Sequence, residues 1–390
     1  MAKRSAKRRV SRADRVEQAL PALSLLTDLP SLDELVPTKE QQEAFDGSCK
    51  RLEREEGVDR CELALGCVVR LDRGFPAVMT ASGVTRSEFA AQLTKGDFSR
   101  VAVGDWVCLR MPEGHEMSLI QEILPRESDI ARWKGGARGE RQTLAANVDV
   151  VLVVQALGAE AISCERIARS AVVAADCGAH VCVVLTKADR AGAEVLGEDL
   201  GLIEQVLGSD ARVAVTAAKG SSDEHGLEQA ARAHGALWGN EGVRELVPHG
   251  TIAIMLGESG AGKSTLLNAL LGRDALETGA VRERDDAGRH TTVARRMVSL
   301  PDAGVIVDEP GLRSLPMVGH ERGLAQVFPE IADAARGCRF RDCTHTHEPG
   351  CEVLERFGSG SFTPVRLETY LALAHEMRES AATLDPDVVI

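Results

Sequence analysis

The chain has 390 residues, 46 basic and 59 acidic side chains, a formal net charge of −13 and 3% aromatic residues. This length predicts two or three domains, and the acidic balance excludes a uniformly basic nucleic-acid-binding protein. Because no apolar run approaches the ~20 residues of a membrane-spanning helix, we expect a cytoplasmic protein with no membrane partner.

The first 60 residues are charged and begin with a basic run between Lys3 and Arg12. Such a run is more often a solvated tail than a specific binding site. Residues 1–60 are therefore predicted to form a flexible extension. As a tail, the extension could still bring the protein to RNA phosphates through salt-sensitive contacts.

Short alternating strands separated by glycine turns follow between residues 62 and 128, for example at 64–71 and 105–110. Their spacing and length predict a small five-stranded β-barrel over residues 61–135. Barrels of this kind often bind nucleic acid, but aromatic side chains that could stack on bases are scarce here. The candidates, each more typical of a core position, are Phe75, Phe89, Phe98 and Trp106.

A motif that can read guanine follows the apolar strand pattern at 181–185: Thr186, Lys187, Ala188 and Asp189. A carboxylate at Asp189 can accept hydrogen bonds from guanine N1–H and from the exocyclic amine, a donor pair that adenine lacks. Alone, this tetrapeptide is typical of a solvated turn. A second strand and loop at 213–220 strengthens it, because Thr216, Ala217 and Ala218 resemble the loop that packs its backbone against guanine in GTPases.

A phosphate-binding loop comes about seventy residues later, between an apolar strand at 251–256 and a helical pattern at 265–271. Its glycines let the backbone wrap phosphate oxygens, and the helix N-terminus adds positive potential. We expect Lys263 to reach the β- and γ-phosphates and the Ser264 hydroxyl to bind Mg²⁺. The predicted nucleotide-binding residues are Gly257, Glu258, Ser259, Gly260, Ala261, Gly262, Lys263, Ser264 and Thr265.

Two further motifs complete the set of a GTPase. Thr291 or Thr292, in a polar stretch, can complete the coordination of Mg²⁺ when γ-phosphate is present. Asp308 follows a strand pattern at 304–307; it would hold Mg²⁺ through water, and the Gly311 N–H would face the γ-phosphate. Each motif alone is typical of an ordinary loop. Together with the phosphate loop they predict Mg²⁺-dependent binding of a guanine nucleotide.

A metal-binding cluster lies near the end of the chain. Cys338, Cys343, His345 and Cys351 fall within fourteen residues, and His347 is a spare neighbour. Three thiolates and an imidazole are a usual ligand set for one structural Zn²⁺, whereas the alternative is three incidental cysteines. The other cysteines are predicted to be small buried apolar residues: Cys49, Cys61, Cys67, Cys108, Cys164, Cys177 and Cys182.

The order of the motifs is reversed, because in an ordinary GTPase the phosphate loop precedes the base-reading loop. In this respect the chain resembles the RsgA-type family of circularly permuted GTPases. The residues at 103–107, 123–128 and 145–149 and the cysteine cluster also resemble that family, over residues 60 to 378. The resemblance implies a multidomain α/β protein with an N-terminal OB-fold barrel, a permuted P-loop GTPase domain at 140–325 and a helical zinc-binding module at 326–390.

The resemblance also implies a function: hydrolysis of GTP to GDP and phosphate, coupled to late maturation of the 30S ribosomal subunit and stimulated by it. The implied partners are GTP, GDP, the 30S subunit and its 16S rRNA, and the protein is expected to be a monomer. One alternative is a nucleotide-gated RNA-binding assembly factor for which hydrolysis is incidental. Another is a small-molecule kinase, which would need an acceptor pocket and a base.

Three positions depart from the usual pattern. Thr186 replaces the asparagine that braces the phosphate loop in most GTPases, and Glu309 places an acid in the Asp308 motif. Leu312 occupies the place of the water-positioning glutamine of Ras-like enzymes, so intrinsic turnover should be slow. We therefore expect His290 to orient the attacking water, with Lys263 and Thr292 as the other catalytic residues. Alternatively, His290 contacts RNA or solvent.

Overall fold

The first strands of the chain close into a small barrel. The computed structural model describes residues 27–72, 75–94, 101–134, 140–158, 161–218, 220, 223–273, 295–308 and 317–382. The barrel strands pair in the closed order β1-β2-β3-β5-β4-β1, which confirms the predicted five-stranded barrel. A short helix, α3 (Ala91–Thr94), follows β3. The strands are β1 (Leu63–Asp72), β2 (Phe75–Thr80), β3 (Gly83–Phe89), β4 (Trp106–Arg110) and β5 (Ser118–Ile123).

An ordered helix, α2 (Lys39–Glu56), lies within the segment that the sequence predicted to be flexible. It begins with a reciprocal cap between Thr38 and Gln41. Phe45, Cys49 and Leu52 recur at helical spacing and are buried, and α2 packs on β4 of the barrel. The prediction was wrong for this part, because burial of an apolar helix face outweighs the charge of the segment. Residues 1–26 lie outside the described residues. Two 3₁₀ helices flank α2: η2 (Leu32–Glu34) and η3 (Arg60–Glu62).

A mostly parallel sheet forms the middle of the molecule, in the order β11-β10-β9-β8-β12-β14-β13. The strands from β11 to β14 in this order run parallel, and β13 is antiparallel to β14. Its central strands are nearly continuous apolar runs because helices cover both faces. The strands are β8 (Val150–Ala156), β9 (His180–Thr186), β10 (Arg212–Val215), β11 (Leu237–Trp238), β12 (Ile252–Leu256), β13 (Arg295–Ser299) and β14 (Val305–Asp308).

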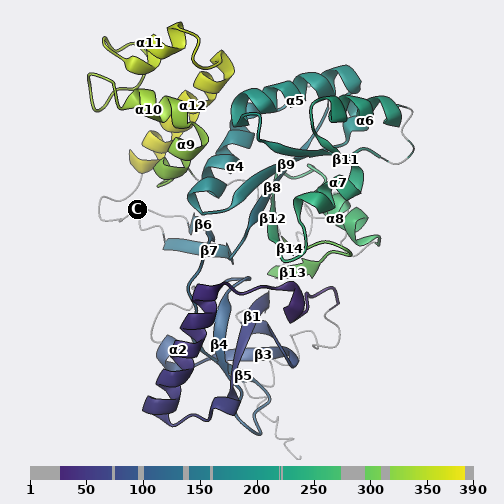
Figure 1. Cartoon of the computed structure of the whole chain (residues 1–390), viewed down its shortest axis with the longest axis vertical. Coiled ribbons are helices and arrows are strands. Elements are labelled where there is room, and N and C mark those ends of the chain that lie inside the picture. The colour runs from purple at the N-terminus through teal and green to yellow at the C-terminus, as the bar shows by residue number, and fades with distance from the viewer. Residues whose placement is uncertain are drawn as a thin grey trace, which may run out of the picture.

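Helices cover this sheet in two groups (Figure 1). Ile167 of α4 and Leu196 of α5 belong to one buried core, whereas Val243 of α7 and Leu267 of α8 belong to a second core on the other face. This arrangement is a doubly wound fold, and it confirms the α/β class predicted for the GTPase domain. The helices are α4 (Cys164–Asp176), α5 (Ala193–Leu207), α6 (Glu224–Ala233), α7 (Gly239–Leu246) and α8 (Lys263–Leu271).

A helical module ends the described chain and docks on α4 (Figure 1). Asp176, at the end of α4, accepts a hydrogen bond from the Gly323 N–H and pairs with His320. Arg169 of α4 pairs with Glu376 of the last helix. The predicted C-terminal helical module is therefore present. Its helices are α9 (Glu321–Val327), α10 (Pro329–Ala335), α11 (Glu352–Gly358) and α12 (Pro364–Ala382).

The barrel and the α/β domain share a continuous sheet. β1 pairs with β13 through Arg70 and Arg296 and through Leu71 and Arg295. A hairpin of β6 (Asp129–Lys134) and β7 (Glu140–Ala146) lies between the two domains (Figure 1). This hairpin spans the domain boundary predicted between residues 135 and 140, and α9 spans the one predicted at 325. Because a hairpin or a helix crosses each of them, both boundaries stay predictions.

Candidate functional site

The predicted nucleotide-binding motifs lie at one edge of the parallel sheet. The strands β9, β10, β12 and β14 are parallel, and the motifs follow their carboxyl ends. Ligands of open α/β sheets bind at this edge. The reversed order of the motifs along the chain therefore does not separate them in space.

The phosphate loop has the backbone that close contact with phosphate requires. Gly257 and Gly262 have φ values of 157° and 93°, and Gly262 caps the N-terminus of α8. A Cβ atom at Gly257 would lie 2.3 Å from the carbonyl oxygen of Val154, so only glycine fits there. The Lys263 ammonium group lies over the loop and donates to the carbonyl oxygens of Gly257 and Glu258. Ser264 and Thr265 lie in the first turn of α8.

Two hydrogen bonds join the predicted base-reading loop to the predicted phosphate loop. The buried Thr186 hydroxyl donates to the carbonyl oxygen of Ala261 at 2.7 Å. Lys187, with a φ of 58°, donates from its ammonium group to the carbonyl oxygen of Gly260 at 2.6 Å. The sequence indicated that a bracing amide is missing at position 186. The structure shows that the threonine hydroxyl braces the phosphate loop instead.

Asp189, the residue predicted to read guanine, lies on the 3₁₀ helix η5 (Ala188–Arg190). Its carboxylate accepts a hydrogen bond from the Ala218 N–H at 2.9 Å. The preceding Thr216 donates its N–H to the carbonyl oxygen of Leu185, which holds the two loops together. The structure therefore brings the two predicted base-contacting loops side by side, with a carboxylate between them.

A charged contact joins the phosphate loop to α4. The Glu258 carboxylate lies 3.1 Å from the guanidinium of Arg166, and both side chains are about half exposed. An acid beside bound phosphates would repel them, and the nearby cation offsets part of that charge. The sequence did not single out Arg166, because an arginine in the first turn of a helix carries no motif.

Asp308 ends β14, the strand next to β12, so its carboxylate lies at the same edge as Ser264. Arg296 of β13 is its partner across the strand ladder. The predicted switch residues His290, Thr291, Thr292 and Gly311, together with Glu309 and Leu312, lie outside the described residues.

The C-terminal module holds a compact set of metal-binding side chains. The ligand atoms of Cys338, Cys343, His345 and Cys351 all lie within 4.8 Å of one another. His345 Nδ1 is 3.5 Å from the Sγ atoms of both Cys338 and Cys351, which are 3.8 Å apart. Zn–S bonds of about 2.3 Å and Zn–N bonds of about 2.0 Å place tetrahedral ligands roughly 3.5 to 3.8 Å apart. These residues therefore fit one tetrahedral ion bound through Nδ1.

Neighbouring groups shape this cluster. Burial lowers the pKa of His345, which keeps the imidazole neutral and able to bind a metal. The Glu348 carboxylate accepts hydrogen bonds from the backbone N–H groups of Thr344, Thr346 and His347. These bonds hold the loop that carries the metal-binding side chains. The His347 ring contacts the Thr346 hydroxyl and is exposed, so it is not part of the described ligand set. The sequence did not indicate the role of Glu348.

Comparison with known proteins identifies the family. The sequence matches the RsgA GTPase family over residues 123–318, just over half of the 390 residues. This chain belongs to the RsgA GTPase family. Its membership confirms the predicted GTPase activity and the resemblance inferred from the motif order.

Relatives of this RsgA GTPase match along most of their length. Small ribosomal subunit biogenesis GTPase RsgA of Streptomyces coelicolor is 38% identical over 320 residues, which are 82% of each chain. The protein of the same name from Leptospira interrogans is 33% identical over 324 residues, which are 83% of this chain and 84% of the relative.

Two solved structures share the fold. YjeQ from Thermotoga maritima has a TM-score of 0.59 and 23% identity, covering 81% of this chain and 99% of the other. YloQ, a circularly permuted GTPase, has a TM-score of 0.54 and 19% identity, covering 82% and 96%. The predicted permuted architecture of this RsgA GTPase is thereby confirmed. None of its helices, in the part of the chain described, combines the length and apolar character needed to cross a membrane.

Proposed function

We propose that this chain hydrolyses GTP during maturation of the small ribosomal subunit and that the subunit stimulates the reaction. The observation that carries the proposal is the pair of bonds from Thr186 and Lys187 to the phosphate loop. They join a guanine-reading carboxylate to a phosphate-binding backbone in one unit. The names of the relatives, which are small ribosomal subunit biogenesis GTPases, supply the biological setting.

Each motif has a proposed role in binding GTP. Asp189 accepts from the guanine N1–H and amine groups, and the Ala217–Ala218 backbone packs against the base. The phosphate-loop N–H groups and Lys263 hold the phosphates. Ser264, Asp308 and a threonine, Thr291 or Thr292, would hold Mg²⁺, which would offset the negative charge that develops on the phosphates.

Orientation of the attacking water is the slow part of this mechanism. Leu312 has no polar group, so it cannot replace the glutamine of Ras-like enzymes. We propose that His290 hydrogen-bonds the water when the 30S subunit is bound, with Thr292 and Lys263 completing the catalytic set. Stimulation by the subunit then raises turnover and leaves the affinity of the free enzyme for GTP nearly unchanged.

The C-terminal cluster is proposed to hold one structural Zn²⁺. Its four protein ligands, Cys338, Cys343, His345 and Cys351, leave no open position for catalysis. The ion would organise the helical module, whose partner we propose to be the 30S subunit with its 16S rRNA. The protein is proposed to act as a monomer in the cytoplasm.

The decisive experiment measures phosphate release from GTP and from ATP, with and without purified 30S and 50S subunits. The proposal expects slow hydrolysis of GTP alone and strong stimulation by 30S but not by 50S subunits. Turnover that ribosomal subunits do not change, together with GTP-dependent RNA binding, would instead support an assembly factor for which hydrolysis is incidental. A phosphorylated small molecule would indicate a kinase.

A further inference from the structure

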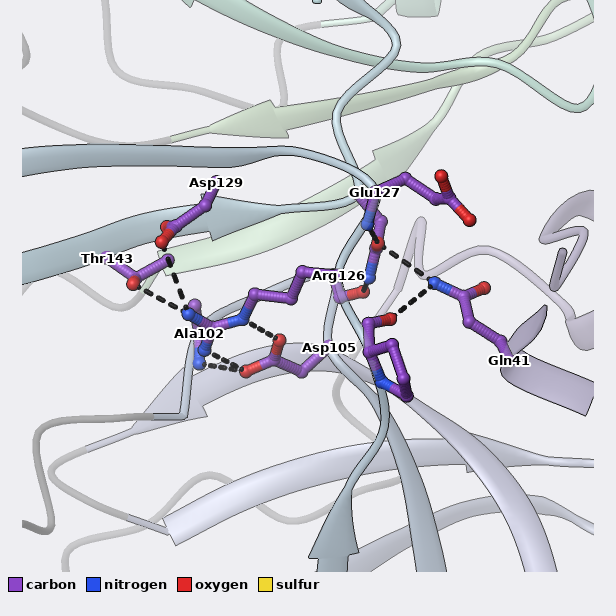
Figure 2. A network of polar contacts seen from close by, with 10 residues as sticks. Gln41, Ala102, Asp105, Arg126, Glu127, Asp129 and Thr143 are labelled. Atoms are coloured by element: carbon purple, nitrogen blue, oxygen red, sulfur yellow. Dashed lines mark hydrogen bonds and ion pairs between the residues drawn. The ribbon is translucent and has the colours of Figure 1, made fainter. Parts of the chain in front are cut away.

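Three sequence segments that resemble the family contribute nothing to the nucleotide or metal sites, at 103–107, 123–128 and 145–149. The structure brings them together where the barrel, the β6–β7 hairpin and α2 meet (Figure 2). Val103 pairs with Ala145 in an isolated parallel bridge, and the Ala146 N–H donates to the Val103 carbonyl oxygen. The loop before β4 is therefore hydrogen-bonded directly to the strand that leads into the GTPase domain.

A buried ion pair lies at the centre of this junction. The Asp105 carboxylate is fully buried and accepts from Arg126 Nε at 2.6 Å, from Arg126 Nη2 at 2.8 Å and from the Ala102 N–H at 2.7 Å. Arg126 Nη1 donates to the Thr143 hydroxyl of β7 at 2.8 Å. One guanidinium thus spans the barrel loop and the hairpin (Figure 2). Such a two-pronged pair is strongly directional, because both partners are planar.

Asn147 makes the second connection. Its side-chain amide donates to the Gly104 carbonyl oxygen of the barrel at 2.8 Å. Its side-chain oxygen accepts from the Glu127 N–H and from Gln41 Nε2 of α2, each at 2.9 Å. Gln41 Nε2 also donates to the Pro125 carbonyl oxygen at 3.0 Å. Four segments distant in sequence therefore meet at one amide, whose own backbone has a φ of 54°.

The backbones approach too closely for other residues at one point. A Cβ atom at Gly104 would lie 2.0 Å from the Ala146 carbonyl oxygen, and Gly104 has a φ of 96°. Both facts require glycine. Because closely packed interiors resist small displacements, this contact limits the movement of the two backbones against each other.

We propose that Gln41, Gly104, Asp105, Arg126 and Asn147 form an interdomain clasp that holds the barrel at a fixed orientation to the GTPase domain. Domains joined by a linker move relative to each other unless their interface prevents it. A clasp removes that motion before binding, so a partner that contacts both domains meets a preformed surface. The identity of that partner, the small ribosomal subunit, rests on the proposed function.

The test exploits two adjacent glutamines of α2. Gln41 is buried in the clasp, whereas Gln42 is exposed on the same helix. Gln41→Glu keeps the helix cap, because its carboxylate can still accept from the Thr38 N–H, but it loses the donor to Pro125 and Asn147. Gln42→Glu makes the same change of charge one residue away and is the matched control. Asn147→Gly removes the amide at a position where glycine tolerates the positive φ.

Hydrogen–deuterium exchange of the protein alone decides whether the clasp exists. In Gln41→Glu and Asn147→Gly, exchange at residues 101–106 and 124–128 should be about tenfold faster, the size expected from losing one or two buried hydrogen bonds. Gln42→Glu should match the wild type. Unchanged exchange in both clasp variants, or equal acceleration in the control, would overturn the proposal. Normal GTP affinity and unstimulated turnover show that a variant is folded.

The effect on the partner is measured separately. The clasp variants should need about tenfold more 30S subunit for half-maximal stimulation, with the rate at saturation unchanged, because only the cost of ordering the domains has risen. An unchanged half-maximal concentration would refute the preformed surface. If 30S subunits fail to stimulate even the wild type, the proposed function fails, while the exchange measurement still decides the clasp.

Discussion

The Thr186 hydroxyl lies 2.7 Å from the carbonyl oxygen of Ala261 and donates a buried hydrogen bond to it, although the two residues are 75 positions apart. This bond connects the loop that we propose reads the base to the loop that we propose holds the phosphates. It performs the bracing for which most GTPases use an asparagine at the same position. The affinity for GTP should therefore depend on a hydroxyl group at position 186.

Thr186→Val keeps the shape of the side chain and removes the hydroxyl donor. We expect GTP to bind about tenfold more weakly, since a lost buried hydrogen bond costs ~1 kcal/mol and leaves the Ala261 carbonyl oxygen unsatisfied. Thr186→Ser, which retains the hydroxyl, should bind nearly as the wild type does. Calorimetric titration measures the affinity of both variants for GTP. If Thr186→Val bound GTP as tightly as the wild type does, the hydrogen bond to Ala261 would not be needed for binding.

Asp189→Asn changes the base preference. An amide cannot accept both guanine donors, so GTP binding should weaken by ~1–3 kcal/mol. Xanthosine triphosphate should become the better ligand, because its ring offers an acceptor to the new amide donor. Competition between the two nucleotides measures the switch. A wild-type protein that bound ATP and GTP equally would contradict the assignment of Asp189.

The zinc proposal predicts one Zn²⁺ per chain by elemental analysis. Cys343→Ser should lose or weaken the metal, whereas His347→Ala should retain it, because the His347 ring contacts Thr346 outside the ligand set. Since metal binding is coupled to local folding, chelation should make the C-terminal module protease-sensitive and leave nucleotide binding largely intact. A metal-free protein with a resistant module would exclude a structural ion.

Acid should remove the contribution that a buried carboxylate in the barrel makes to the stability of the folded protein. Asp72 pairs with Arg70 and Arg86. Burial raises its pKa, but the hydrogen bonds from the two arginines outweigh that effect and the pKa is lowered. A lowered folded-state pKa means that the stabilisation is complete above the ordinary value of ~4 and is lost as the pH falls through the folded-state pKa.

Asp72→Asn should therefore lower the free energy of unfolding by about 3 kcal/mol at pH 7, because it leaves two cations without their partner. The difference between variant and wild type should shrink as the pH falls from ~4 through the lowered folded-state pKa of Asp72, where the wild-type carboxylate also becomes protonated. Urea denaturation at pH 7 and below pH ~4 measures the free energy of unfolding of both proteins. A difference that is constant with pH would remove the ion pair from the explanation.

His290→Ala tests the positioning of water. Most of the 30S-stimulated rate should disappear, while the affinities for GTP and for 30S stay near those of the wild type. Lys263→Ala, in contrast, should impair nucleotide binding itself. Phosphate release under saturating 30S subunits measures the effect. Full stimulated activity of His290→Ala would assign the orientation of water to the ribosome.

The sequence predicted best those parts of the structure whose residues lie close together along the chain. A strand, a glycine loop and a helix are contiguous at the phosphate site, and Cys338 to Cys351 lie in one short segment. The helix α2 could also have been predicted, because Thr38 and Gln41 form a capping box before an apolar face at Phe45, Cys49 and Leu52. The basic run between Lys3 and Arg12 precedes that pattern and is itself typical of a solvated tail.

The sequence by itself determined the chemistry of this RsgA GTPase, because phosphate-loop, base-reading and cysteine motifs require particular residue types at fixed local spacings. Only the tertiary structure decided that Thr186 braces the phosphate loop and that Gln41 meets Asn147, 106 residues away. These bonds join backbone and side-chain groups of segments that no local pattern relates. Their partners are set by the packing of the barrel against the α/β sheet, because most of the polar groups that such packing buries must find a hydrogen-bond partner.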